Sequence, residues 1–187
     1  MLNKLLALGA LALAPLPLQA APETPAAPAA PAGPAAPAPQ LRWVFSLRAD
    51  LDPPIEMGEV DGGRRRFIAI RGGKVYGPAL QGEVLAGGGD WQSIMPGGLT
   101  KVEARYFLKA ADGTVIEVTN PGVRTASAEV VERLARGEDV DPSLYYFRTT
   151  PSFRVRDGAH GWMQRSAFVA RGIRRPDHVA IDYYVVE

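Results

Sequence analysis

Cysteine is absent from this 187-residue chain, and histidine occurs only twice, at His160 and His178. Without cysteine the chain can form no disulfide framework, no thiol nucleophile and no zinc–thiolate site, so packing alone must stabilise its fold. Neither histidine has a second metal ligand at a characteristic spacing, and two ordinary loop histidines are the simpler interpretation. The sequence therefore predicts no metal site.

The chain also lacks a strong charge of either sign and the glycine patterns that bind phosphate. It has 21 basic and 20 acidic residues, and the formal charge of +1 provides no broad attraction to nucleic acid or anionic lipid. Gly87-Gly88-Gly89 fits neither the phosphate loop nor the dinucleotide fingerprint. We therefore expect no cofactor and no nucleic-acid partner, and we favour a small-molecule ligand.

The first 39 residues are expected to lie outside the folded domain. A basic start, an apolar run broken by Pro15 and Pro17, and the small residue Ala20 at the expected cut are typical of a secretory signal peptide, residues 1–20, with a buried helix as the alternative. Residues 21–39 are almost entirely alanine and proline, which predicts a semi-rigid linker. A single domain then spans residues 40–187. We expect a periplasmic or secreted protein with no membrane insertion after signal cleavage.

Apolar and polar residues alternate along most of the remaining chain, which predicts antiparallel strands. Asp112-Gly113 lies between two such segments and is a strong hairpin signal. The expected strands are residues 41–51, 65–71, 74–85, 90–95, 99–110, 115–120, 144–150, 166–174 and 178–186. Glycine recurs from Gly72 to Gly89, and glycine inside a strand pattern indicates a bulge or a barrel corner.

One predicted helix interrupts the strands. Ser127 is suited to cap its N-terminus, Glu129 lies in the first turn, and Val130, Val131 and Leu134 form an apolar stripe. About nine short antiparallel strands with one helix favour an all-β fold, a closed or nearly closed barrel, because closure removes exposed strand edges. The interior of such a barrel either holds a cavity or is filled by side chains.

Several separated sequence blocks resemble one bacterial family. They are Gly72 to Trp91, Ala104-Arg105-Tyr106, Tyr145 to Pro151, and Trp162 to Val169. In this order they resemble the domain of unknown function 3237, also described as uncharacterised protein family 0311. The resemblance implies an antiparallel barrel similar to the calycins and lipocalins, which hold small ligands inside the barrel, and it implies no settled activity. The sequence departs from the family at Ala86, where proline is usual, and at Met163-Gln164, where leucine and asparagine are usual. If that asparagine lines a pocket, Gln164 alters its depth.

Asp90 and Trp91 follow three glycines, an arrangement that presents a carboxylate and an indole at a barrel rim. An acid beside an aromatic wall is suited to act as a base or to anchor a ligand. The alternative is an aspartate that caps the turn and a tryptophan that packs in the core. Asp90 is thus a candidate catalytic residue, and whether the chain is an enzyme stays open.

Four arginines lie within or beside predicted strands: Arg105, Arg124, Arg148 and Arg165. Two inward guanidinium groups would clamp a carboxylate, whereas outer-face arginines would pair with acidic neighbours. With Tyr106 inward, alternation points Arg105 outward, and it places Tyr146 and Arg148 on one face of their strand. The run Arg64-Arg65-Arg66 is interpreted as a solvated strand start. The predicted ligand-binding set is Asp90, Trp91, Tyr106, Asn120, Arg124, Tyr146, Arg148 and Trp162.

Two functional hypotheses follow from these residues. The first is a binding barrel that holds a small, partly apolar, anionic molecule between aromatic walls and arginines. The second is a cofactor-free isomerase, dehydratase or cyclase that uses the same cavity for acid/base chemistry, with Asp90 or a tyrosine moving the proton. A structural domain with a filled interior is a third possibility.

Overall fold

The computed structural model describes residues 37–187, so the predicted signal peptide and nearly all of the predicted linker lie outside the described residues. None of the helices in the described part is sufficiently long and apolar to span a membrane. The strands are β1 (Leu41–Leu51), β2 (Ile55–Val60), β3 (Gly63–Tyr76), β4 (Gly82–Val84), β5 (Gly88–Ile94), β6 (Leu99–Ala110), β7 (Val115–Ala126), β8 (Tyr145–Thr149), β9 (Ser152–Val155), β10 (Phe168–Arg174) and β11 (His178–Val186). The helices are α1 (Ala128–Ala135) and the 3-10 turns η1 (Pro96–Gly98), η2 (Pro142–Leu144) and η3 (Gly161–Arg165).

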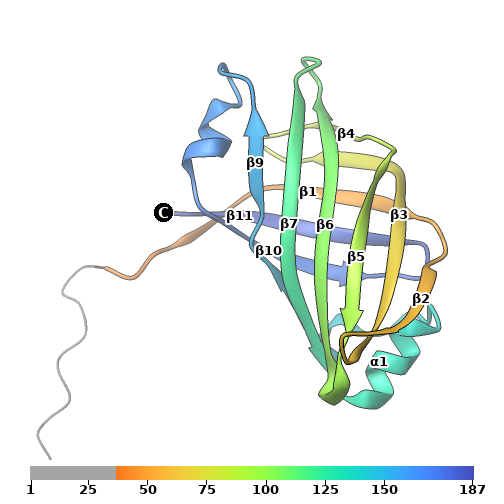
Figure 1. The fold of residues 1–187 in the computed structure, drawn as a ribbon. Helices are drawn as coiled ribbons and strands as arrows, with labels where there is room; N and C mark the ends of the chain where they lie inside the picture. The colour runs from red at the N-terminus through yellow and green to blue at the C-terminus, as the bar shows by residue number, and fades with distance from the viewer. Residues whose placement is uncertain (1–36) are drawn as a thin grey trace, which may run out of the picture. The chain divides into compact units, whose positions relative to one another are not determined.

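Eight of these strands close into an antiparallel ring. Its order is β1-β3-β5-β6-β7-β8-β10-β11, with β11 pairing back onto β1. In Figure 1 the strands β5, β6 and β7 run across β1, β10 and β11, as two layers of a strongly bent barrel do. The predicted all-β barrel with one helix is confirmed.

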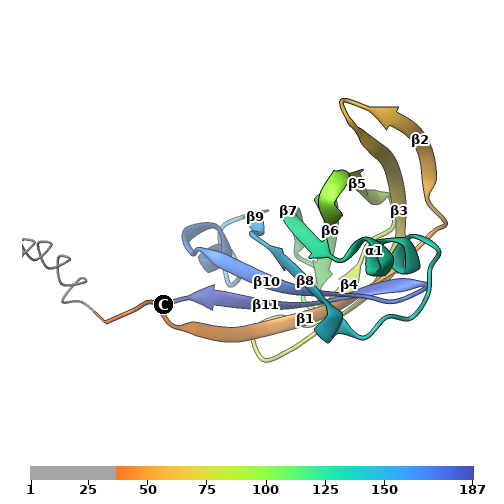
Figure 2. The same ribbon diagram turned by 90° about the horizontal axis from the view of Figure 1, so that it is seen from below.

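Three short strands lie outside the ring, so the described residues contain eleven strands and not about nine. The strands β2 and β4 pair with β3, and β9 pairs with β7. Figure 2 shows the β2–β3 hairpin extending beyond the rest of the sheet. All six residues of β2 are exposed, and no alternation of buried and exposed positions marked this strand in the sequence.

The strand β3 corrects one prediction about the glycine-rich segment. Residues 65–71 and 74–85 were expected to be separate strands, but β3 runs continuously from Gly63 to Tyr76 and changes partners along its length. Gly73 makes this possible, because it has φ +151 and a Cβ there would collide with the carbonyl of Arg48 in β1. The glycine therefore allows close strand crossing at a corner of the barrel.

The helix α1 forms as its cap signals predicted. The Ser127 hydroxyl accepts a hydrogen bond from the Val130 amide at 3.3 Å, which satisfies one of the free N–H groups of the first turn. Val130 and Leu134 pack with Val102 and Phe147. The helix thereby covers one end of the sheet.

The barrel interior has two different halves. One half is packed solid: the ring of Phe45 stacks on Tyr183 at 4.4 Å, and Phe153 contacts both Phe168 and Tyr183. Each such fully buried side chain contributes about 2 kcal/mol to folding. In the half nearer α1, the inward positions of the same strands carry polar and charged side chains.

Candidate functional site

A cavity of about 40 Å³ lies in the polar half of the barrel. Its apolar lining includes Ala49, Leu51, Ile70, Val102, Ala104, Phe147, Val179 and Ile181, and its polar lining is Asp90, Gln92, Tyr106, Asn120, Arg124, Thr149 and Arg174. The space accommodates about three water molecules, whereas pockets for drug-sized ligands begin near about 300 Å³. It fits the charged head of a small molecule.

Arg124 is the most unusual side chain in this cavity. It is 2% exposed, and its Nε and Nη1 atoms have no hydrogen-bond partner among the described residues. Its guanidinium carbon lies 5.8 Å from the centroid of the Phe147 ring. Burial lowers the pKa of Arg124 to about 10, and repulsion from Arg66 and Arg174 adds to this effect. Within residues 37–187, no carboxylate forms an ion pair with the buried Arg124.

Two further arginines point into the same half of the barrel. Arg174 donates from Nη1 to the carbonyl oxygen of His178 at 3.0 Å and to that of Arg175, while its Nε has no partner in the described residues. Burial lowers the pKa of both Arg174 and Arg66. Among the cavity-lining residues the only carboxylate is Asp90. Positive charge therefore exceeds negative charge in this interior.

A chain of hydrogen bonds holds Asp90 at the cavity wall. Arg66 in β3 donates from Nε and Nη2 to Oε1 of Gln92 in β5, at 2.9 and 2.8 Å. Because a guanidinium group can only donate, it fixes the Gln92 amide so that Nε2 faces Asp90. That Nε2 donates to Asp90 Oδ2 at 2.5 Å, and the Glu103 amide donates to Oδ1 at 3.0 Å. Both carboxylate oxygens are thus occupied and oriented.

Opposing influences act on the protonation of Asp90. Burial is the largest and raises its pKa, whereas the hydrogen bonds from Gln92 and the Glu103 amide lower it, as do the charges of Arg124 and Arg66. The net effect is a raised pKa. A carboxyl group of this kind is suited to hold or release a proton beside a bound molecule.

Polar groups also form the boundary with the packed half. The hydroxyl groups of Tyr106 and Tyr183 are hydrogen-bonded to each other, and Asn120 donates from Nδ2 to the Tyr183 hydroxyl at 3.4 Å. The other amide atom, Asn120 Oδ1, has no partner in the described part of the chain, and neither has Thr149 Oγ1. Buried polar atoms are normally satisfied by protein, water or ligand. The cavity therefore offers both donors and acceptors to an occupant.

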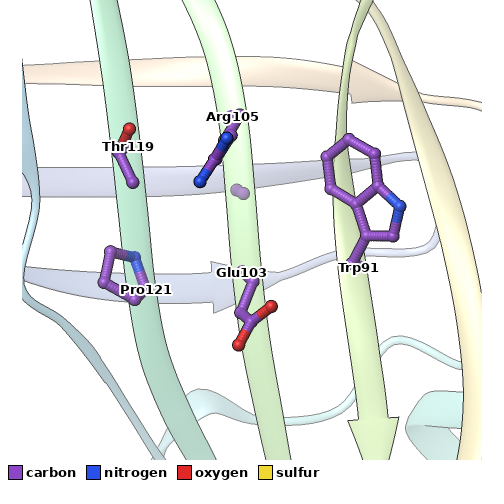
Figure 3. Close-up of a pocket in the computed structure, with 6 residues that line it drawn as sticks. Trp91, Glu103, Arg105, Thr119 and Pro121 are labelled. Atoms are coloured by element: carbon purple, nitrogen blue, oxygen red, sulfur yellow. The ribbon is translucent and has the colours of Figure 1, made fainter.

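Four of the eight sequence-predicted site residues meet at this cavity: Asp90, Tyr106, Asn120 and Arg124. Trp91 does not, because it follows Asp90 on a regular strand and points outward. It is 39% exposed and packs on Phe67, with ring centroids 4.8 Å apart. Figure 3 shows it with Glu103, Arg105, Thr119 and Pro121, which line a pocket on the outer face.

The other three predicted residues also lie elsewhere. Tyr146 and Arg148 share one face of β8, as alternation predicted, but it is the outer face. Tyr146 is 51% exposed, and the Arg148 guanidinium carbon lies 5.0 Å above its ring. Trp162 lies in η3 and packs against Phe168 at the solid half. Gln164, in the same turn, donates to the Val155 carbonyl at 2.5 Å and does not line the cavity.

Sequence reasoning missed four polar residues of the interior: Arg66, Gln92, Thr149 and Arg174. The interpretation of the arginine run as a solvated strand start is wrong for Arg66, which is 3% exposed. The sequence could have indicated this, because Arg66, Ile68 and Ile70 occupy alternate positions of one strand and therefore share a face, and both isoleucines are buried. Gln92 likewise lies two residues after Asp90 in β5 and shares its face of the strand.

The described residues contain no group of three or more histidine, aspartate or glutamate side chains placed to hold a metal ion. The polar groups that line the cavity are guanidinium, carboxyl, hydroxyl and amide groups. These groups bind anions, donate hydrogen bonds and move protons.

The fold and its interior define a class of protein, a closed antiparallel barrel with a polar cavity in one half. The chain belongs to the family described as protein of unknown function (DUF3237), whose model matches residues 39–186. The family resemblance predicted from the sequence blocks is thus confirmed. A UPF0311 protein of Bradyrhizobium diazoefficiens is 41% identical over 145 residues, which are 78% of this chain and 95% of that protein.

Solved structures of similar proteins have the same architecture. A conserved protein of unknown function from Rhodopseudomonas palustris is 38% identical, with a TM-score of 0.78 over 81% of this chain and 100% of its own. A β-barrel-like protein from Acinetobacter baumannii is 36% identical, with a TM-score of 0.71 over 81% of this chain and 98% of its own. These likenesses establish family and fold, and they assign no activity.

Proposed function

We propose that the polar half of the barrel binds a small, partly apolar anion, with Arg124 as the principal contact. The observation that carries this proposal is the buried guanidinium group of Arg124, whose Nε and Nη1 have no partner among the described residues. A charge buried without a partner is strongly unfavourable, and an anionic ligand would remove that cost. A carboxylate head matches a guanidinium group through two parallel hydrogen bonds.

The rest of the lining supports the same ligand class. Arg174 and Arg66 add positive charge, and Asn120 and Thr149 offer further polar atoms. Ala49, Leu51 and Ile181 form an apolar wall for the remainder of the molecule. Because the cavity measures only about 40 Å³, a ligand larger than a simple carboxylate requires side chains to move.

Calorimetric titration of formate, acetate and benzoate against their neutral analogues acetamide and benzamide tests the proposal. At least one carboxylate should bind, and its amide should bind at least about tenfold more weakly, because charge-assisted hydrogen bonds contribute about 1.5–3 kcal/mol. Arg124→Met should abolish the preference, while Arg105→Ala, on the outer face of β6, should retain it. Equal binding of amides and carboxylates, or full retention in Arg124→Met, would overturn the proposal.

The second candidate is an enzyme that isomerises, dehydrates or cyclises its substrate without a cofactor, and the position of Asp90 favours it. The Asp90 carboxyl group borders the cavity with its pKa raised by burial, and the Tyr106 hydroxyl lies in the same lining. Asp90→Asn distinguishes the two functions. A binding protein keeps its anion affinity in this variant, whereas an enzyme keeps the affinity and loses turnover of the bound molecule.

We propose in addition that the barrel acts outside the cytoplasm. This rests on the basic start and apolar run of residues 1–20 and on the small residue Ala20 at the expected cut. N-terminal sequencing of the protein from a periplasmic or culture fraction should begin at Ala21. An intact Met1 in the cytoplasmic fraction would contradict this proposal.

A further inference from the structure

The barrel wall is least continuous between β8 and β10. Their pairing consists of two registered pairs, Thr149 with Ala170 and Arg148 with Arg171. Every other neighbouring pair of strands in the ring registers at least five residue pairs. Few ladder hydrogen bonds therefore hold this seam, and local opening requires the least disruption here.

Beyond these two pairs, side chains take the place of the backbone ladder. The Arg174 amide of β10 donates to the side-chain hydroxyl of Tyr145 at 3.0 Å. A backbone carbonyl of β8 would accept this hydrogen bond in a continuous sheet. One tyrosine hydroxyl thus joins the two strands at this end.

The Phe147 ring fills the remaining gap from within. It lies against the backbone of Gly172, where a Cβ would come within 2.5 Å of the ring atoms Cδ1 and Cε1. The guanidinium group of Arg124 stands over the ring of Phe147, 5.8 Å from its centroid. This single side chain therefore lies between the weak seam and the unpartnered cation.

A second hollow, of about 560 Å³, lies on the outer side of the same seam. Arg148 and Arg171 are registered strand neighbours that both line it, and neither forms an ion pair within the described part of the chain. Asp182, opposite Arg171 on β11, instead accepts a hydrogen bond from Ser46 at 2.6 Å. Like charges directly opposite each other are unfavourable in a sheet, but they attract anions from solution.

We propose that the seam between β8 and β10 is the portal through which an anion reaches the cavity, and that Phe147 is its gate. The proposal rests on the proposed anion-binding function. An anion first meets Arg148 and Arg171 in the outer hollow. The two registered pairs of β8 and β10 then separate and the Phe147 ring rotates. These movements expose Arg124, which binds the anion.

A gate variant and a matched control test the portal by binding kinetics. In Phe147→Leu, benzoate association and dissociation measured by stopped flow should both accelerate about tenfold, with a smaller change in Kd, because a smaller side chain leaves the route open. Phe153→Leu shortens an aromatic side chain in the packed half and should leave both rates unchanged. Equal rates in the wild type and Phe147→Leu would overturn the portal.

Hydrogen exchange gives a readout that needs no ligand. The Arg174 amide should exchange about tenfold faster in Phe147→Leu than in Phe153→Leu, because its bond to Tyr145 breaks when the seam opens. If the wild type binds none of formate, acetate and benzoate, the proposed function fails, and the exchange rates still decide whether this seam opens. Equal exchange in the two variants would contradict the gate.

The absence of cysteine permits a direct mechanical test. Registered strand neighbours have Cα separations of about 4.5–5.5 Å, which suit a disulfide. In a variant with Arg148→Cys and Arg171→Cys, oxidation should slow benzoate association at least tenfold relative to the reduced form. The control carries Arg105→Cys and Thr119→Cys, a registered pair on the continuous β6–β7 seam, and should show no change. Unchanged association in the oxidised β8–β10 variant would rule out this portal.

Discussion

Arg66 and Gln92 are joined by two hydrogen bonds, from Nε and Nη2 of the guanidinium group to the single amide oxygen Oε1, at 2.9 and 2.8 Å. The pair fixes the amide so that its nitrogen donates to Asp90. One residue from the arginine run in β3 and one from β5 thereby determine how a carboxyl group is presented to the cavity. The protonation of Asp90 depends on this arrangement.

Gln92→Leu should raise the pKa of Asp90 further. The Gln92 hydrogen bond is the largest of the influences that lower this pKa, so its loss leaves the effect of burial less opposed. Carbon-13 NMR titration of the Asp90 carboxyl measures the shift. Gln81→Leu is the control, because Gln81 is exposed and bonds only to the Gly77 carbonyl at 3.5 Å. An unchanged or lowered pKa in Gln92→Leu would contradict the proposed orientation.

Asp90→Asn should change how stability depends on pH. Because the pKa of Asp90 is raised in the fold, the folded state binds more protons than the unfolded state between the ordinary carboxyl pKa and the raised one. Asp90 therefore costs stability as pH rises through this window. The free energy of unfolding of Asp90→Asn minus that of the wild type should increase with pH there and stay flat below it. Urea denaturation at several pH values measures this difference, and a decrease would contradict the sign.

Arg124→Met should stabilise the ligand-free protein. Methionine replaces a buried charge that has no ion-pair partner among the described residues by an apolar side chain of similar length, and removing the cost of burying that charge should gain about 1–4 kcal/mol, the range seen when buried ion pairs are replaced by apolar residues. Arg148→Met, on the outer face, should change the free energy of unfolding by less than about 0.5 kcal/mol. Denaturant midpoints compare the two variants. A loss of several kcal/mol in Arg124→Met would show that its charge is satisfied within the fold.

Gly73→Ala should destabilise the barrel more than Gly87→Ala. Both glycines have positive φ, but a Cβ at Gly73 meets the Arg48 carbonyl, whereas one at Gly87 meets open space. The difference between the variants isolates the cost of the collision from the cost of the backbone conformation, and should exceed about 2 kcal/mol. Thermal unfolding measures it. Equal loss in both variants would mean that the strand crossing at Gly73 can relax.

Most of the architecture could be predicted from the sequence, because the alternation of apolar and polar residues and the residue preferences of turns are local properties. Residues 41–51, 99–110 and 178–186 were predicted with the bounds that β1, β6 and β11 have in the structure. Ser127 marked the start of the only α-helix among the described residues. Exposed β2 escaped prediction because no buried face gave it a hydrophobic pattern.

The site was only partly predictable, because alternation tells which residues share a face and not which face is inside. In β6 and β7 the apolar residues of one face identify the inner side, and Tyr106 and Asn120 lie on that side. In β8 both faces carry an aromatic residue, so Arg148 was chosen although Phe147 and Thr149 face the cavity. Only the pairing of Phe147 with Arg124 across β7 and β8 reveals the inner side, and pairing is a tertiary property.

Nitrogen-15 NMR of the arginine Nε–H groups tests whether Arg124, which has no partner for Nε among the described residues, receives an anion. Titration with benzoate should shift the Arg124 resonance and protect it from exchange, while the Arg105 resonance on the outer face stays unchanged. Benzamide at the same concentrations should have no effect. An Arg124 resonance that does not respond to carboxylates, or that is already protected by a hydrogen bond in the free protein, would contradict the account.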